Sequence, residues 1–333
     1  MSQMIIAPHD ITIAITVFDR RRFLRQAIAS ALDQKFPVRV MVLEDCGPDP
    51  GMRSFVEQEF GTRVEYIRNP RRRGLFDNWN ACLEHCRTGW LSILHDDDML
   101  TPAFVEAMIE MNRSAPDCGL YFGETLFVDG QGNKGRWSIR PPLTMPWQRT
   151  SLEETLAMTP FAYPGNLMRV DYARAIGGFR AFSQYCGDWE MWCNLIARYG
   201  AAQTATAVAV NRCHDGLERG SSKILLNGRL RPLSFVQQKR ILRLLGEAGK
   251  PMTFDRGWFL KDSPMSADYL LRYGAGLTPR LLRYNVGLLL RSPSPSLPYL
   301  AFKAGAGLFG VPFVRATSRL FRAFSGSRKG GTP

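Results

Sequence analysis

The first 112 residues alternate between short apolar runs and segments with helical spacing, which leaves few folds open to the chain. The apolar runs are Ile11–Val17, Val38–Leu43, Val64–Ile67 and Trp90–Leu94. The segments with helical spacing are Arg21–Leu32, Met52–Phe60, Leu75–Cys86 and Pro102–Asn112. Strands separated by helices of this length form a mostly parallel sheet with right-handed crossovers. The expected fold class is therefore α/β.

Polar residues directly follow the four expected strands. Three of the four strand ends carry carboxylates, namely Asp19, Glu44 with Asp45, and Asp96–Asp98, and arginines stand beside them. Ligands of parallel sheets bind beyond the carboxyl ends of the strands. An edge that combines carboxylates with arginines suits a phosphate-bearing ligand that carries a metal ion.

The run Asp96-Asp97-Asp98 is the sharpest local feature. Three adjacent carboxylates repel one another unless a cation neutralises them. Oxygen ligands of this kind suit Mg²⁺ or Mn²⁺. The alternative is a helix start near Thr101-Pro102, where acidic residues favour the helix dipole. A helix start accounts for one aspartate but not for three, so we expect a divalent metal at this turn.

Several motifs, taken in their order along the chain, resemble glycosyltransferase family 2, whose catalytic domain has the GT-A fold. The resemblance runs from about residue 11 to residue 222, and the matching segments are Ile11–Arg20, Ser30–Gln34, Leu43–Gly47, Asn69–Asn80, Ile93–Pro102, Gly177–Phe179 and Asp188–Trp192. It implies a Rossmann-like α/β/α sandwich of GT-A type over residues 1–225. It also implies an inverting transferase that uses a nucleotide sugar, with UDP favoured by family frequency, and Mn²⁺ or Mg²⁺ as cofactor.

The resemblance assigns a role to particular residues. It places the nucleotide sugar against Thr16, Phe18, Asp45, Gly74, Asp96 and Arg212. Within this set Phe18 would stack on the base, Asp45 would bind the base and Asp96 would hold the ribose. Asp97 would bridge the metal, and His214 would be a further metal ligand on a loop that closes over the diphosphate. From its chemistry, Arg212 could pair with the diphosphate, because a guanidinium group matches phosphate bidentately. It could equally be an arginine of a solvated loop.

Three positions depart from the family pattern. His95 stands where the family often has the first aspartate of its Asp-x-Asp segment, so metal binding would depend on Asp97. Glu44 and Cys46 replace the commoner aspartate and small residue, which leaves the choice of base open.

Asp188 is the candidate general base. An inverting transfer needs the acceptor hydroxyl to lose its proton as it attacks, and a carboxylate can accept that proton. From spacing alone, Asp188 could equally cap the helix expected at Asp188–Arg198. The resemblance favours the catalytic role.

The net charge of +13 is concentrated at one end of the chain. Residues 1–227 carry 25 basic and 26 acidic side chains, whereas residues 228–333 carry 18 basic and four acidic ones, with none acidic after Asp268. A basic, mostly helical C-terminal region is therefore expected at 226–333, with a disordered end at 326–333. Within it, Phe313–Phe324 predicts a helix with arginines on one face and aromatic residues opposite, which suits an anionic membrane surface. The alternative is that this helix packs on the catalytic domain.

Two other functions are compatible with parts of the sequence. A sugar nucleotidyltransferase would also need aspartates and a metal, but it usually has a glycine-rich loop after the first strand, and Thr16–Arg22 contains no glycine. A nucleic-acid-binding protein is disfavoured because the body of the chain is nearly neutral. No signal peptide is visible at the N-terminus. We expect a cytoplasmic, peripheral membrane enzyme whose acceptor is a carbohydrate or a lipid-linked sugar.

Overall fold

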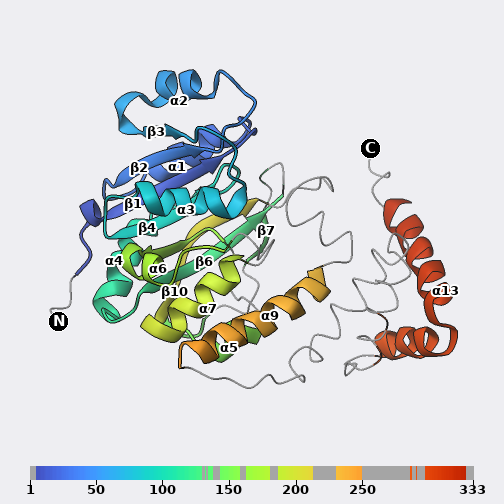
Figure 1. The fold of residues 1–333 in the computed structure, drawn as a ribbon. Helices are drawn as coiled ribbons and strands as arrows, with labels where there is room; N and C mark the ends of the chain where they lie inside the picture. Colours follow the sequence, from blue (N-terminus) through green and yellow to red (C-terminus); the bar gives the residue numbers. More distant parts are fainter. Residues whose placement is uncertain are drawn as a thin grey trace. The chain divides into compact units, whose positions relative to one another are not determined.

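The computed structural model describes residues 5–129, 132, 134–137, 143–157, 163–180, 187–212, 230–249, 286, 290 and 297–327 (Figure 1). The strands are β1 (Ile11–Val17), β2 (Arg39–Glu44), β3 (Glu65–Arg68), β4 (Trp90–His95), β5 (Met99–Leu100), β6 (Leu120–Val128), β7 (Lys134–Trp137), β8 (Trp147–Arg149), β9 (Asn166–Arg169) and β10 (Ala201–Arg212). The α-helices are α1 (Leu24–Leu32), α2 (Met52–Phe60), α3 (Leu75–His85), α4 (Phe104–Ser114), α5 (Leu152–Ala157), α6 (Val170–Ala175), α7 (Gly187–Tyr199), α9 (Leu230–Glu247) and α13 (Leu297–Ser327).

The strands join in one mixed sheet, in the order β3-β2-β1-β4-β9-β6-β10-β5. The first four strands of the chain are parallel, and Thr16 of β1 lies opposite His95 of β4. Since Val17 also lies opposite Glu44, and Glu44 opposite Arg68, these four strands end at the same edge. The expected mostly parallel α/β sheet is confirmed, and the edge that carries the candidate residues is common to all four strands.

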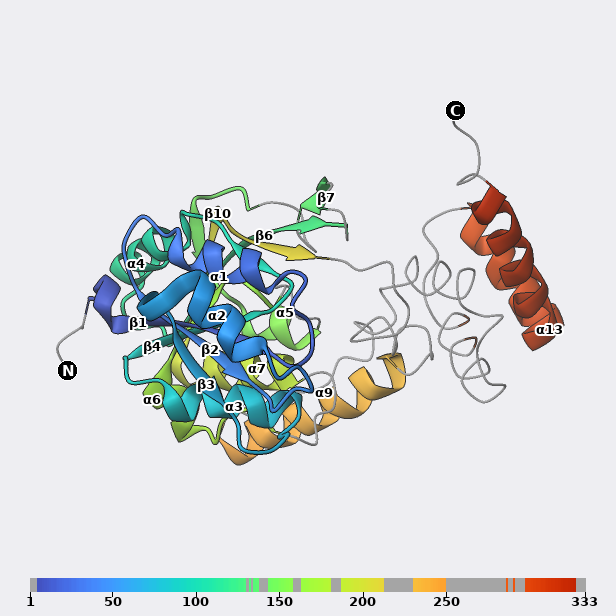
Figure 2. The same cartoon turned by 90° about the horizontal axis from the view of Figure 1, so that it is seen from above.

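Helices cover both faces of the sheet (Figures 1 and 2). The apolar side chains of β1 alternate, with Ile11, Ile13 and Ile15 packing among α1, α2 and α4 in one cluster. Ala14 faces the opposite cluster, which contains residues of α3, α6 and α7. This alternation follows from the two-residue period of a strand. The α/β/α sandwich expected from the resemblance is therefore present.

The second half of the sheet differs from the sequence-based expectation. β9 inserts between β4 and β6 and pairs with both in the antiparallel sense. The stretch 130–147, which is rich in glycine, proline and arginine, contributes β7 and the start of β8. These pair at the margin with β6 and β10. Edge pairing of this kind depends on neighbouring strands and not on local composition.

The chain forms two compact units. The first contains β1 to β10 with α1 to α7, and the second contains α13 and nearly all of α9. In α13, Gly310 has a non-helical backbone (φ 60°, ψ −142°) that separates two helical halves. The expected helix 313–324 lies in the second half, and Phe313 is partly buried there. Its ring lies 5.8 Å from that of Phe302 in the first half. Among the described residues, no helix is long and apolar enough to cross a bilayer.

Candidate active site

The triple-aspartate turn links β4 to β5 and is buried. Asp96, Asp97 and Asp98 are 4%, 9% and 2% exposed. Burial of a carboxylate disfavours its charged form, so an ionised cluster here needs cations. Burial raises the pKa of Asp96 to about 7 and also raises the pKa of Asp98.

Arg20, which follows β1, supplies one of these cations. Its guanidinium donates to Asp96 Oδ1 at 2.5 Å and also to Asp97 Oδ2. Burial alone would lower the pKa of Arg20, but Asp96 and Asp97 outweigh it and the pKa is raised. The guanidinium group of Arg20 therefore bridges two neighbouring carboxylates, which the single ammonium group of a lysine could do less well.

Asp98 and His95 extend the cluster on its other side. His95 Nδ1 lies 3.6 Å from Asp98 Oδ2, and the backbone N–H of Arg212 donates to Asp98 Oδ1 at 2.9 Å. Burial would lower the pKa of His95, but the carboxylates of Asp98, Asp97 and Asp96 raise it overall. The charges of the aspartate turn therefore stabilise the protonated imidazole of His95.

His95, Asp97 and Asp98 form a candidate metal site. One ligand atom from each lies within 4.8 Å of the others. Two carboxylate oxygens and one imidazole nitrogen are a donor set that a divalent ion such as Mn²⁺ accepts. The sequence indicated the aspartate run, with Asp97 as the bridging ligand, but it did not indicate His95 as a ligand. The other expected ligand, His214, lies outside the described residues.

Arg212, at the end of β10, is buried and hydrogen-bonded to other residues of the protein. It is 7% exposed, its Nε donates to the backbone oxygen of Asp97 at 3.1 Å, and its Nη2 donates to Gln26 at 2.9 Å. Its guanidinium also lies 4.2 Å from the ring centre of Phe23. Arg212 therefore fixes the aspartate turn against α1.

Asp45 organises the loop between β3 and α3. Asp45 Oδ1 accepts the backbone N–H of Arg73 at 2.7 Å and the amide of Asn69 at 3.1 Å. Asp45 Oδ2 accepts the N–H of Gly74 at 2.9 Å. Gly74 has φ +88° and stands directly before α3, a conformation that a glycine adopts without strain. The two candidate nucleotide residues Asp45 and Gly74 are thus in direct contact.

The ends of β1 and β2 press together beside Asp45. A Cβ at Gly47 would lie 1.6 Å from the carbonyl oxygen of Phe18, so only glycine fits there. Glu44 is fully buried and accepts from the Gly47 N–H at 2.9 Å and from Tyr66 and Arg68. The departure from the family pattern at Glu44 is therefore structural, because this carboxylate joins β2 to β3.

Two more expected residues sit at this edge. The Phe18 ring is partly exposed, and the guanidinium of Arg72 lies 4.3 Å from its centre. Thr16 is buried, and its hydroxyl donates to the backbone oxygen of Leu94 at 3.5 Å. The next arginine, Arg73, does not contact Phe18 in this way but forms an ion pair with Glu84.

Asp188 lies in the first turn of α7. Its Oδ1 accepts the N–H of Trp189 at 2.9 Å, as a helix-terminal aspartate does. Burial raises its pKa, and His95 opposes this shift. The charge of His95, a residue of the candidate metal site, therefore acts on Asp188.

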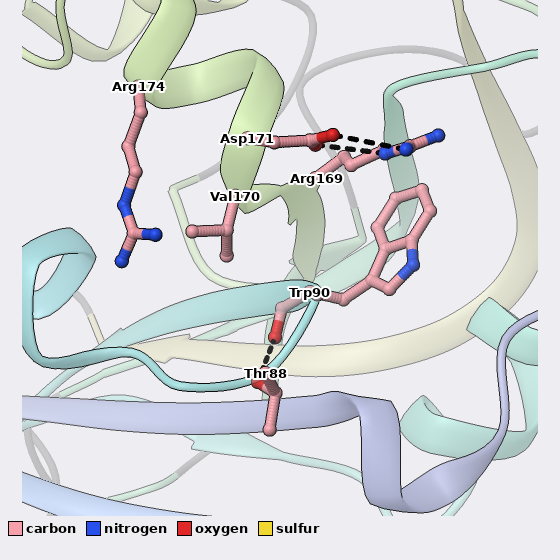
Figure 3. A pocket seen from close by; sticks show the side chains of 7 residues that line it. Thr88, Trp90, Arg169, Val170, Asp171 and Arg174 are labelled. Carbon is pink, nitrogen blue, oxygen red and sulfur yellow. Dashed lines mark hydrogen bonds and ion pairs between the residues drawn. The ribbon is translucent and has the colours of Figure 1, made fainter.

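A separate cavity of about 200 Å³ lies at the other end of β4 (Figure 3). Trp90 begins that strand, and Arg169, which lines the cavity with it, pairs with Asp171 at 2.9 and 3.0 Å. Arg174 donates to the backbone oxygens of Leu83 and Cys86. Because these charged groups are already paired and the strand ends lie elsewhere, this cavity is not the candidate active site.

Comparison with known families identifies the domain that carries this edge. The model of glycosyl transferase family 2 matches residues 12–181, half of the chain. The chain belongs to glycosyl transferase family 2. Within the family 2 domain, the strand-end carboxylates occupy the positions described above, and the GT-A fold expected from the motifs is confirmed by the sheet and by solved glycosyltransferase structures.

Individual relatives of this family 2 chain are distant. An uncharacterized glycosyltransferase of Rickettsia felis is 22% identical over 217 residues, 64% of this chain and 35% of that protein. An uncharacterized protein of Mycobacterium tuberculosis, MT1568, is 25% identical over 219 residues, 61% of this chain and 66% of that protein. The chain thus spans about a third of the length of the Rickettsia relative.

A solved structure shares the fold. The crystal structure of S. aureus TarS 1-349 in complex with UDP-GlcNAc has a TM-score of 0.55 at 12% identity. The match covers 94% of this chain and 91% of that one. At this identity the likeness concerns the fold.

Proposed function

We propose that the chain transfers a sugar from a nucleotide diphosphate sugar to an acceptor hydroxyl with inversion, and that UDP is the nucleotide. The observation that carries this proposal is the position of the buried aspartate turn. It shares one sheet edge with the Asp45 loop, and Asp188 lies near its His95. The nucleotide would lie at the Asp45 loop, the diphosphate at the aspartate turn and the reacting hydroxyl at Asp188.

The nucleotide end of the donor would lie against Phe18 and Asp45. Phe18 offers a partly exposed ring for the base, and Arg72 now lies over that ring. Asp45 holds the N–H groups of the loop before α3, so the base would meet a loop whose shape is already set. Asp96 would take the ribose. The complex of TarS with UDP-GlcNAc supports UDP as the first nucleotide to test.

The diphosphate end would lie at the aspartate turn. A divalent ion held by Asp97, with His95 and Asp98 in reach, would neutralise the charge that develops on the leaving diphosphate. Arg20 stands at the same carboxylates and would be the nearest protein cation to the phosphates. Arg212 holds the turn in place through its bond to the backbone oxygen of Asp97.

Asp188 would act as the base. Its carboxylate would accept the proton of the acceptor hydroxyl while that oxygen attacks the anomeric carbon, from the side opposite the diphosphate. Burial raises the pKa of Asp188, which makes the carboxylate a stronger base than an exposed aspartate. The acceptor would be a carbohydrate hydroxyl of a surface polysaccharide or of a lipid-linked sugar.

The proposed donor can be tested by thermal shift. UDP, GDP, CDP and ADP, each with and without Mn²⁺, should give unequal rises in melting temperature, with the largest rise for UDP and Mn²⁺ together. A ligand at 100 times its Kd stabilises by about 2.7 kcal/mol, which is a shift of several degrees for a domain of this size. Equal shifts for all four nucleotides, or the same shift with EDTA present, would contradict the proposal.

The second unit would hold the enzyme on the cytoplasmic face of an anionic membrane. In α13, Leu308, Phe309 and Leu320 are 78%, 67% and 59% exposed, and no acidic residue follows Asp268. Exposed apolar side chains within a basic segment suit anionic lipid.

Liposome flotation tests this attachment with the full chain. Binding to vesicles with anionic lipid should exceed binding to neutral vesicles several-fold, and the double change Leu308→Ser and Phe309→Ser should reduce it. The control is Met145→Ser, which removes a side chain that is 60% exposed in the first unit. Equal flotation with both kinds of vesicle would rule the attachment out.

A further inference from the structure

Three aromatic rings from three different elements stack beside the aspartate turn. The ring of Tyr163 lies 4.2 Å from that of His95, with 7° between their planes. It also lies 4.4 Å from the ring of Trp79 on α3. Trp79 and His95 are 5.6 Å apart and nearly parallel. We call these three residues the ring stack.

Each ring of the stack carries a polar atom that is buried without a hydrogen-bond partner. Within the described part of the chain, Trp79 Nε1, His95 Nε2 and Tyr163 Oη are all of this kind. Trp79 and Tyr163 are 3% and 9% exposed as whole residues. Unpaired buried polar groups cost stability, and native proteins keep few of them. Three such atoms in one stack therefore point to a ligand that pairs with them.

The chemistry of the three atoms limits what that ligand is. The indole Nε1–H of Trp79 only donates, whereas the hydroxyl of Tyr163 both donates and accepts. A sugar hydroxyl also donates and accepts, so it can pair with either group. Flat rings with polar atoms at their edges match a sugar ring, which has apolar C–H faces and hydroxyls around its rim.

The place of the stack fits one sugar of the reaction. His95 belongs both to the stack and to the candidate metal site. Asp188 is close enough to Tyr163 and His95 to influence both electrostatically. The stack therefore shares His95 with the candidate metal site, and the proposed function places the anomeric carbon beside that site.

We propose that the ring stack of Trp79, Tyr163 and His95 is the binding surface for the transferred sugar, and that Tyr163 Oη hydrogen-bonds a hydroxyl of that sugar. This proposal rests on the proposed function, because it assigns part of the same donor site. It names residues that contact the sugar and not the nucleotide. The variant Tyr163→Phe isolates the contact, since it keeps the ring and removes only the hydroxyl.

Two measurements on Tyr163→Phe test the proposal together. The melting temperature of the free protein should stay the same or rise, because the lost hydroxyl has no partner. Affinity for the UDP-sugar should fall about 5- to 10-fold, the value of one hydrogen bond, while affinity for UDP should not change. The probes are UDP and, with Mn²⁺, whichever of UDP-N-acetylglucosamine, UDP-glucose and UDP-galactose stabilises the wild type most.

Tyr121→Phe is the matched control. Tyr121 is also buried and stacked, 5.3 Å from Trp90, but its hydroxyl is paired with Asn112 at 3.0 Å and Ala115 at 2.9 Å. This variant should lose about 2–4 °C of melting temperature and keep both affinities.

The outcomes separate the two proposals. If Tyr163→Phe binds UDP and the UDP-sugar as the wild type does, the ring stack does not contact the sugar and only this inference fails. A fall in its melting temperature to match that of Tyr121→Phe would show that a protein group pairs with the hydroxyl, which has the same consequence. If the wild type binds neither UDP nor any UDP-sugar, the proposed function itself fails.

Discussion

Replacing Asp97 with asparagine should reduce sugar transfer by about 10²- to 10³-fold, the usual loss when one group that stabilises developing charge is removed. Asparagine keeps the shape of the side chain but carries no charge for a divalent ion. Asp97 is also bonded to Arg20, so the variant leaves that arginine with one carboxylate, Asp96. The stabilisation of the protein by UDP should consequently lose its dependence on Mn²⁺. Initial rates of UDP release measure the loss of transfer, and melting temperatures with UDP, taken with and without Mn²⁺, measure the loss of metal dependence.

Asp117→Asn is the control for this change. Asp117 pairs with Arg149 at 2.7 Å, and both side chains are more than half exposed. An exposed ion pair contributes little stability, so this variant should transfer sugar at the wild-type rate. Full activity of Asp97→Asn at low Mn²⁺ would show that the aspartate turn does not hold the metal.

Replacing Asp188 with asparagine should lower kcat by about 10²- to 10⁴-fold, the contribution of a positioned base. Nucleotide affinity should stay unchanged, because Asp188 would act on the acceptor. Burial raises the pKa of Asp188 and the base must be deprotonated, so wild-type kcat should rise with pH through a value above that of an ordinary aspartate. The pH profile of Asp188→Asn should lack this rise.

A matched control separates catalysis from helix capping. Asp171 Oδ1 accepts the N–H of Tyr172 at 2.9 Å, the same local contact that Asp188 makes with Trp189. Asparagine caps a helix about as well as aspartate. The change also removes the ion pair of Asp171 with Arg169, but exposed pairs contribute little. Asp171→Asn should therefore change stability by at most about 1 kcal/mol and leave the rate unchanged. If Asp188→Asn behaves like Asp171→Asn, then Asp188 is a cap and another residue is the base.

The first half of the fold could be read from the sequence because its signals are local. Ile11–Val17 and Met52–Phe60 have the expected bounds, and the parallel order follows from strands separated by helices. The position of β9 could not be read in this way. Its four residues pair antiparallel with β4 and β6, and the sequence of Asn166–Arg169 does not predict which strands are its neighbours.

The candidate site follows the same division. The triple aspartate and Asp45 stand out because they follow strands whose carboxyl ends meet at one edge, and Asp188 stands out through the family resemblance. The partners of these residues were harder to find. Tyr163 lies in an irregular segment, and its contacts with Trp79 and His95 come from tertiary packing alone. The paired state of Glu44 likewise depends on Tyr66 and Arg68 of a neighbouring strand.

The bridge from Arg20 to Asp96 and Asp97 has a consequence for the order of events at this edge. While the guanidinium stays there, the carboxylates are already compensated, and a free ion in solution gains little by entering. A donor that arrives with its ion supplies both a replacement for the arginine and phosphates for the arginine to bind. Loading of the metal and of the donor would then be a single exchange of partners, and a vacant enzyme would not need to store the ion.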